Sequence, residues 1–448
     1  MKVTFLVAMG FLFSFIECRS QNSVVNTALP SFNPQGLTIA APGTNFYTQG
    51  SSDAARLIYE QDAREYELQK RKELAALREA YKDLGIEKKP IPINSGVSKI
   101  NYRHTPNNAY GRVHFEKALT EITDMIEGRA PYNLKRAVFL TEHAYDTTLN
   151  FKQFERQISK LVEIIQLKMK QDHISTSDNT GKIMTAFQFM ADTITVKNSV
   201  LEKTITTYPK VYDFEDFYGM RDYHKMFVSK LVRTGKGQCH SLPLLFLILC
   251  QEINAKAYLS FAPEHSYVKF KDDNGAFHNI ELTNQMLSTD QFILQSGFIK
   301  SSAIKSGIYM DTLAIDRVII STINDLSNSY VRKYGYDDFV LKCSLLVTNK
   351  DSHSISGYMH VSNYYNSLFI KIKRQYELLG YGNREFQNDI EFKRIAGLAR
   401  HWSKYVDNLG FATMPPDLYS LWLGSLKDES MRQQFIEKKN VLNHIMEH

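Results

Sequence analysis

The chain of 448 residues is poor in cysteine, and its four thiols are Cys18, Cys239, Cys250 and Cys343. So few cysteines over this length do not form the disulfide framework of small secreted domains. Cys239 and Cys250 are eleven residues apart, which on one helix is a rise of about 16 Å, whereas a disulfide needs Cα atoms within about 7 Å. We therefore expect Cys239 to be a free thiol.

The chain also lacks an excess of one charge and several signature motifs. Its 54 basic and 48 acidic residues give a net charge of +6 without any block of like charge, which argues against nucleic-acid binding. Neither Cys-x-x-Cys nor His-Glu-x-x-His occurs, so we expect no metal and no cofactor. The stretch "TGKGQC" is not a phosphate loop, because it lacks the glycine spacing and the Lys-Ser/Thr ending.

Long apolar runs are absent except at the start, "MKVTFLVAMGFLFSFIECRSQNS". One lysine, about fourteen mainly apolar residues and then small side chains are typical of a secretory signal peptide over 1–20, cleaved between Ser20 and Gln21. Acylation of Cys18, as in a lipoprotein, is the weaker alternative, because Glu17 stands where a small residue is usual. We expect an exported protein, periplasmic or extracellular, without a membrane span, since every other apolar run is too short.

The remaining composition is that of a globular protein. A hydrophobic content of 43% with 12% aromatic residues supplies a sizeable core, and the length allows two or three domains. The pattern divides the chain into a linker (21–52), a long charged helix with a connector (53–110), a helical region (111–204), a mixed core (205–310) and a second helical region (311–448) that faintly resembles tetratricopeptide repeats. We predict the α+β fold class.

Local signals within these regions predict individual elements. Apolar stripes and stop signals predict four helices. The first ends before Gly128, the second runs from Pro131 to about Tyr145, and the third and fourth cover 151–165 and 182–191. In the mixed core, short segments rich in aromatic and branched residues read as strands, and Asp273-Asn274-Gly275 is a strong hairpin signal.

The segment "GKGQCHSLPLLFLILC", from Gly235 to Cys250, places Cys239 between a glycine-containing loop and an apolar helix. A catalytic cysteine reacts as the thiolate, and a helix N-terminus can lower a cysteine pKa from about 8.5 to between about 3.5 and 7.5. Because Pro243 does not fit a helix interior, the regular helix is predicted to begin between residues 240 and 243, with Cys239 at or just before its first turn. The residues that follow are apolar on every side, which predicts burial.

A base and its partner follow in the strand-like segments. His265 begins "HSYVKF" and can take the thiol proton, and Glu281 lies sixteen residues further on, where antiparallel pairing sets its carboxylate beside the imidazole. Plainer interpretations stay open: an inert buried cysteine, a structural histidine and an ordinary strand carboxylate, with Asn279 as another partner for the histidine. We expect His240 to cap the helix or face solvent, and Gln238 to point away from the thiol.

Together "GKGQC", the buried helix, "PEHSYVKF" and "NIELT" resemble the transglutaminase-like superfamily, relatives of the papain-type cysteine proteases. That family places cysteine at a helix N-terminus, histidine on one strand and aspartate on the next, often as Asp-Pro-Thr. Cys239 and His265 match the first two, and Glu281-Leu282-Thr283 stands where Asp-Pro-Thr is usual. No side chain matches the family's oxyanion stabiliser, which leaves the backbone N–H of Cys239. The glutamate and "CHSLP" look more like the bacterial exported branch with helical repeats.

The resemblance covers residues 205–300 and implies an enzyme. It implies acyl transfer or hydrolysis at peptide or isopeptide bonds through Cys239, His265 and Glu281, with a peptide or protein as substrate. Hydrolysis is favoured, because water needs no second binding site. The rival is a non-catalytic transglutaminase-like module whose helical flanks, above all the C-terminal helices, hold a protein partner.

Overall fold

The computed structural model describes residues 100–105, 110–198, 202–296, 298–380 and 388–413, and the backbone of two short strands that pair with each other, β1 (Phe5–Val7) and β2 (Ser14–Ile16). The predicted cleavage site after Ser20, the linker over 21–52 and the charged helix expected within 53–110 lie outside the described residues. The helices and strands that follow belong to one unit of the chain.

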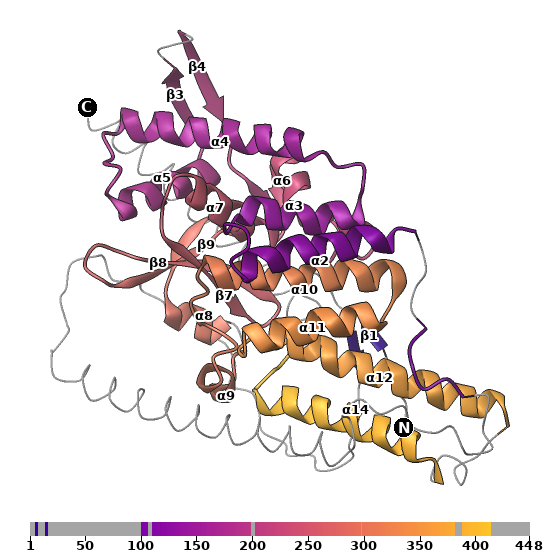
Figure 1. Ribbon diagram of the computed structural model, residues 1–448. Coiled ribbons are helices and arrows are strands. Elements are labelled where there is room, and N and C mark those ends of the chain that lie inside the picture. Colours follow the sequence, from indigo (N-terminus) through magenta and orange to yellow (C-terminus); the bar gives the residue numbers. More distant parts are fainter. Residues whose placement is uncertain are drawn as a thin grey trace, which may run out of the picture. The chain divides into compact units, whose positions relative to one another are not determined.

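The described part of this unit opens with helices α2 (Arg112–Ile126), α3 (Leu134–Tyr145), α4 (Phe151–Gln171) and α5 (Asn179–Ala191), shown in Figure 1. Their bounds confirm the helices that the apolar stripes predict. Helix α3 begins three residues after Pro131 rather than at it, because the side chain of Asn133 accepts the Arg136 N–H and caps the helix there. The apolar faces of all four helices join one core.

The helical region predicted over 111–204 ends in a β hairpin instead. Strands β3 (Ile194–Asn198) and β4 (Lys203–Thr207) pair antiparallel over their full lengths. Buried and exposed side chains alternate along β3, as the period of a strand requires. The threonines of both strands, together with isoleucine and valine, branch at Cβ and favour extended backbone, which is the physical reason for the difference.

Helix α7 (Ser241–Glu252) occupies the centre of the mixed region. All its residues from Ser241 to Cys250 are buried, which confirms the predicted burial. It contacts α3, α4, α5 and α6 (Val228–Thr234). It also contacts β7 (Ala257–Ala262) and β8 (His265–Lys271), the two strands of a four-stranded antiparallel sheet that come first in the chain. The strand order is β10-β9-β8-β7, with β9 (Phe277–Glu281) and β10 (Met286–Ser288) completing the sheet.

The turn between β8 and β9 confirms the predicted hairpin. The Asp272 carboxylate accepts the N–H groups of Asn274 and Ala276, and Gly275 adopts the positive φ of +87° that the turn requires. Within the sheet, Val268 stands opposite Ile280 and Lys269 opposite Asn279. This register fixes which ends of β8 and β9 meet.

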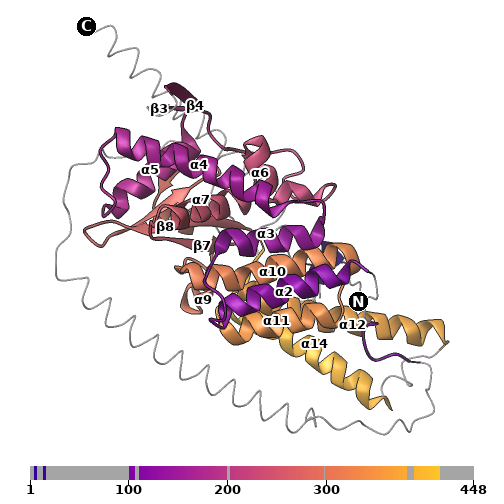
Figure 2. The same ribbon diagram turned by 45° about the horizontal axis from the view of Figure 1, so that its top comes forward.

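The chain continues in further helices, of which Figure 1 labels the first and Figure 2 the others: α8 (Asp290–Ser296), α9 (Ser301–Lys305), α10 (Ile315–Tyr334), α11 (Asp338–Lys350), α12 (Ile355–Leu378) and α14 (Ile390–Asn408). Helices α10, α11, α12 and α14 pack in succession, and α10 also packs against α2 and α3. The resemblance of this region to tetratricopeptide repeats stays a prediction.

Helices and small sheets of these kinds confirm the α+β fold class. One apolar cluster joins α2 to α5, α7, the inner face of the sheet, α10 and α11, and a second lies between α12 and α14. Among the described residues, no helix combines the length and the apolar composition needed to cross a bilayer.

Candidate functional site

The loop that leads to Cys239 is held by a short parallel pair of strands, β5 (Val211–Tyr212) and β6 (Lys236–Gly237). Gly235 ends α6 in the left-handed region at φ +72°, a conformation that suits glycine. At Gly237 a Cβ atom would meet the Ser241 hydroxyl at 2.8 Å and a Leu231 methyl group at 3.0 Å. The second glycine therefore allows close approach of the loop to α7 and α6.

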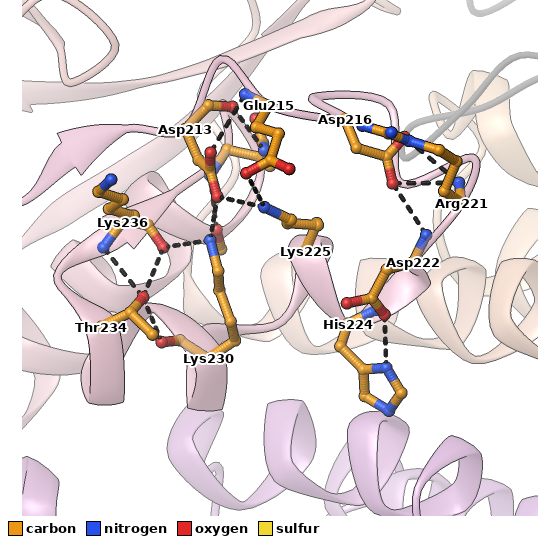
Figure 3. A network of polar contacts seen from close by, with 12 residues as sticks. Asp213, Glu215, Asp216, Arg221, Asp222, His224, Lys225, Lys230, Thr234 and Lys236 are labelled. Carbon is orange, nitrogen blue, oxygen red and sulfur yellow. Dashed lines mark hydrogen bonds and ion pairs between the residues drawn. The ribbon is translucent and has the colours of Figure 1, made fainter.

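A buried carboxylate anchors the same loop (Figure 3). Asp213 accepts hydrogen bonds from Lys230 at 2.6 Å and Lys225 at 3.1 Å, while its backbone N–H donates to Gly237 at 2.8 Å. Burial raises the pKa of Asp213, but the hydrogen bonds from Lys230 and Lys225 outweigh it and hold the pKa below its ordinary value. Nothing in the sequence pattern pointed to Asp213, because irregular chain without a periodic pattern separates it from both lysines.

Cys239 lies in the turn directly before α7, which begins at Ser241 as the sequence predicts. Its side chain is only 7% exposed, and Sγ lies 3.9 Å from the carbonyl oxygen of Glu264. The Ser266 hydroxyl donates to the Cys239 carbonyl at 2.6 Å and joins the turn to strand β8. The thiol is therefore held at a helix N-terminus, where the unpaired N–H groups favour a negative charge.

His265 and Glu281 meet at one end of the sheet, because β8 begins at His265 and the antiparallel β9 ends at Glu281. The Nε2 atom of His265 lies 2.5 Å from Oε2 of Glu281, and both side chains are at most 2% exposed. The other carboxylate oxygen accepts the backbone N–H of Thr283 at 2.9 Å. The Glu281 carboxylate is thus oriented, and Nδ1 is the ring nitrogen that can take a proton from Cys239.

The charges around His265 favour its protonated form. Burial lowers the pKa of His265, but the negative charge of Glu281 and the hydrogen bond with Cys239 outweigh burial and raise it to about 10. An imidazole in this setting binds a proton tightly at neutral pH. The structure therefore brings the three predicted residues together in an arrangement suited to moving a proton from the thiol to the imidazole.

The neighbours of the predicted site differ in part from expectation. His240 neither faces solvent nor caps α7 through its side chain: it is 8% exposed, and its Nε2 lies 3.3 Å from an Asp325 carboxylate oxygen on α10. Gln238 points away from the thiol as predicted, since its amide donates to the Asp213 carbonyl at 2.9 Å. Asn279, the alternative partner for the histidine, instead donates to Asp290 at 2.8 Å.

Cys250 and Cys343 are also free thiols, but both are almost fully buried. Burial raises the pKa of each thiol well above its ordinary value. Within the ranges that the structure describes, no group of three or more His, Cys, Asp or Glu residues is arranged to hold a metal ion. Among the described cysteines, Cys239 is therefore the candidate nucleophile.

Comparison of the chain with protein-family models, with curated proteins and with solved structures finds no match.

Proposed function

We propose that the chain is a cysteine-dependent acyl-transfer enzyme of the transglutaminase-like kind, which hydrolyses peptide or isopeptide bonds with Cys239 as nucleophile. The observation that carries the proposal is the buried contact of 2.5 Å between His265 and Glu281 beside a cysteine at the start of a buried helix. A nucleophile, a base and a group that orients the base are what such a reaction needs.

The proposed reaction begins when Nδ1 of His265 takes the proton of the Cys239 thiol. The thiolate attacks the carbonyl carbon of the substrate, and the imidazolium then gives its proton to the leaving amine as the carbon–nitrogen bond breaks. Water, deprotonated by the same nitrogen, attacks the thioester, and the carboxylic acid and the thiol are released. Glu281 stays ionised throughout and stabilises the imidazolium.

The negative oxygen of the tetrahedral intermediate needs a donor. We assign this role to the backbone N–H of Cys239, because the neighbouring side-chain amide of Gln238 is used by Asp213. That same commitment of Gln238 favours the second candidate, a non-catalytic module that keeps the fold while its helices bind a protein partner. Export after cleavage of the signal peptide remains part of both proposals.

Alkylation of the three described cysteines separates the two candidates. With iodoacetamide at pH 6, a thiol activated by His265 reacts faster in the folded protein than in the chain unfolded in urea, because a coil cysteine is then mostly protonated. Mass spectrometry of the labelled peptides gives the rate at each cysteine, and we expect Cys250 and Cys343 to react only after unfolding.

A histidine variant and its control test whether the base is responsible. His265→Ala is expected to lower the folded-state rate at Cys239 by at least about ten-fold, since it removes the proton acceptor. His278→Ala replaces a more exposed histidine of the neighbouring strand, with 43% of its side chain exposed, and is expected to leave the rate unchanged. If Cys239 reacts no faster folded than unfolded, the enzymatic function is abandoned in favour of the binding module.

A further inference from the structure

Glu264, the residue before His265, has a carboxyl group that the proposed reaction does not use, and its backbone lies beside the thiol. With Pro263 it forms the two-residue turn between β7 and β8, in the left-handed region at φ +55°. Its carbonyl oxygen lies 3.9 Å from Sγ of Cys239. The turn therefore holds Glu264 at the edge of the candidate site.

Two tyrosine hydroxyl groups lie within range of the Glu264 charge. Burial raises the pKa of Tyr218, and the negative charges of Glu264 and Cys239 raise it further, so this hydroxyl is within electrostatic range of both groups. Tyr309 is only 4% exposed, and its buried hydroxyl has no hydrogen-bond partner in the described ranges. Burial and, after it, the charge of Glu264 also raise the pKa of Tyr309, so both tyrosine hydroxyl groups are within electrostatic range of Glu264.

Within the described ranges, no cationic side chain forms an ion pair with the Glu264 carboxylate. Its side chain is half-buried, and burial raises the pKa of Glu264 to about 7 without any cation of the described chain acting against burial. Once Cys239 has given its proton to His265, the thiolate and the imidazolium balance, and Glu281 adds a negative charge. When Glu264 is ionised, the region therefore has a further negative charge that a cation on a bound molecule would offset.

We propose that Glu264 binds a cationic group of the substrate close to the bond that Cys239 attacks. The inference rests on the proposed function and adds the substrate class to it: a peptide with a lysine or arginine side chain near the attacked carbonyl group. An ammonium or guanidinium group forms charge-assisted hydrogen bonds with a carboxylate, and its charge favours the ionised form of Glu264. Glu264 is then a specificity-determining residue.

A pair of thiol reagents of similar size and opposite charge tests this without a known substrate. We would measure the rates at Cys239 with 2-(trimethylammonio)ethyl and 2-sulfonatoethyl methanethiosulfonate, each divided by its rate with a small free thiol. The ratio of the two rates cancels the thiolate fraction at any pH. We expect the folded wild-type chain to favour the cationic reagent by about ten-fold at pH 8, with a ratio that rises between pH 6 and 8 as Glu264 ionises.

Variants assign the preference to one carboxylate. Glu264→Gln is expected to lower the ratio by at least about three-fold, and Glu264→Asp to keep it, since the second variant retains the charge. Glu377→Gln on α12 changes the net charge equally at an exposed position and should leave the ratio unchanged.

Two results contradict the inference in distinguishable ways. A fast reaction at Cys239 with a ratio near one, constant from pH 6 to 8, overturns the role of Glu264 and leaves the proposed function standing; this measurement needs only the wild-type chain. A Cys239 that reacts with neither reagent while the chain is folded overturns the proposed function, and the inference with it.

Discussion

Replacing Glu281 by glutamine tests the orientation of the base more sharply than removing the base itself. The carboxylate has two partners, the Thr283 N–H and Nε2 of His265. A glutamine has one oxygen, and the Thr283 N–H can bond only to that oxygen, because an N–H cannot donate to an NH2 group. The amide NH2 would then face Nε2, which favours the imidazole tautomer with its proton on Nδ1. That tautomer cannot accept the thiol proton.

The size of the effect follows from the charges at His265. Its pKa of about 10, against an ordinary 6.5, corresponds to about 5 kcal/mol in favour of the imidazolium. Glu281 is the larger of the two groups that raise the pKa, so loss of its charge is expected to remove most of this preference. This predicts a loss of about 10² to 10³ in any rate that depends on proton transfer to His265. Glu281→Asp should also lower the rate, because the shorter side chain withdraws the carboxylate by about 1.5 Å.

The assay is the rate of Cys239 alkylation at neutral pH, with turnover added once a substrate is found. Thermal melting of each variant checks that the chain is folded, and Cys239→Ala gives the background. If Glu281→Gln is folded and its Cys239 reacts like wild type, Glu281 is an ordinary strand carboxylate and the reasoning is refuted.

Two further predictions concern stability. Asp213→Asn leaves the Lys230 ammonium group, which is 11% exposed, without its buried partner. The change should lower the free energy of unfolding by about 3 kcal/mol, measured by urea titration at pH 7. A decrease below about 1 kcal/mol would contradict this. Burial lowers the pKa of His360 from 6.5 to about 4. Between pH 6.5 and pH 4 the unfolded chain therefore binds more protons than the folded chain. The free energy of unfolding falls as the pH drops through this range, by up to about 3 kcal/mol. His360→Gln should remove this fall in stability. The measurement is the free energy of unfolding of the wild-type chain and of the variant, each determined from pH 7 to pH 4.

The features that could be predicted from the sequence are those fixed by neighbouring residues. Pro243 and the apolar run after it set the start and the burial of α7, and Asp273-Asn274-Gly275 sets the turn that brings β8 against β9. Because that turn pairs the two strands antiparallel, it also brings His265, where β8 begins, and Glu281, where β9 ends, to the same end of the sheet.

The features that could not be predicted depend on contacts that no local pattern specifies. The partner of His240 is Asp325 on α10, and the anchor of the loop before the thiol is Asp213, whose lysines come from η2 (Tyr223–Met226) and α6. The β3–β4 hairpin has a local signal in its threonines, but short strands beside amphipathic helices are easily taken for a helix end. The position of Glu264 next to the thiol follows from the fold of the turn between β7 and β8 against Cys239, which the sequence does not indicate.

The burial of α7 on all sides separates the residues that form the site from those that hold it in place. The segment from Gly235 to Ser288 contains Cys239, His265, Glu281 and the sheet, yet α7 also contacts α3, α4, α5 and α6, which precede that segment in the chain. Excised alone, the segment would expose a largely apolar helix to water and would not stay folded. The candidate site is therefore not a transferable module: a deletion within α3 to α5 is expected to abolish the proposed reactivity of Cys239, although Cys239, His265 and Glu281 would remain in the chain.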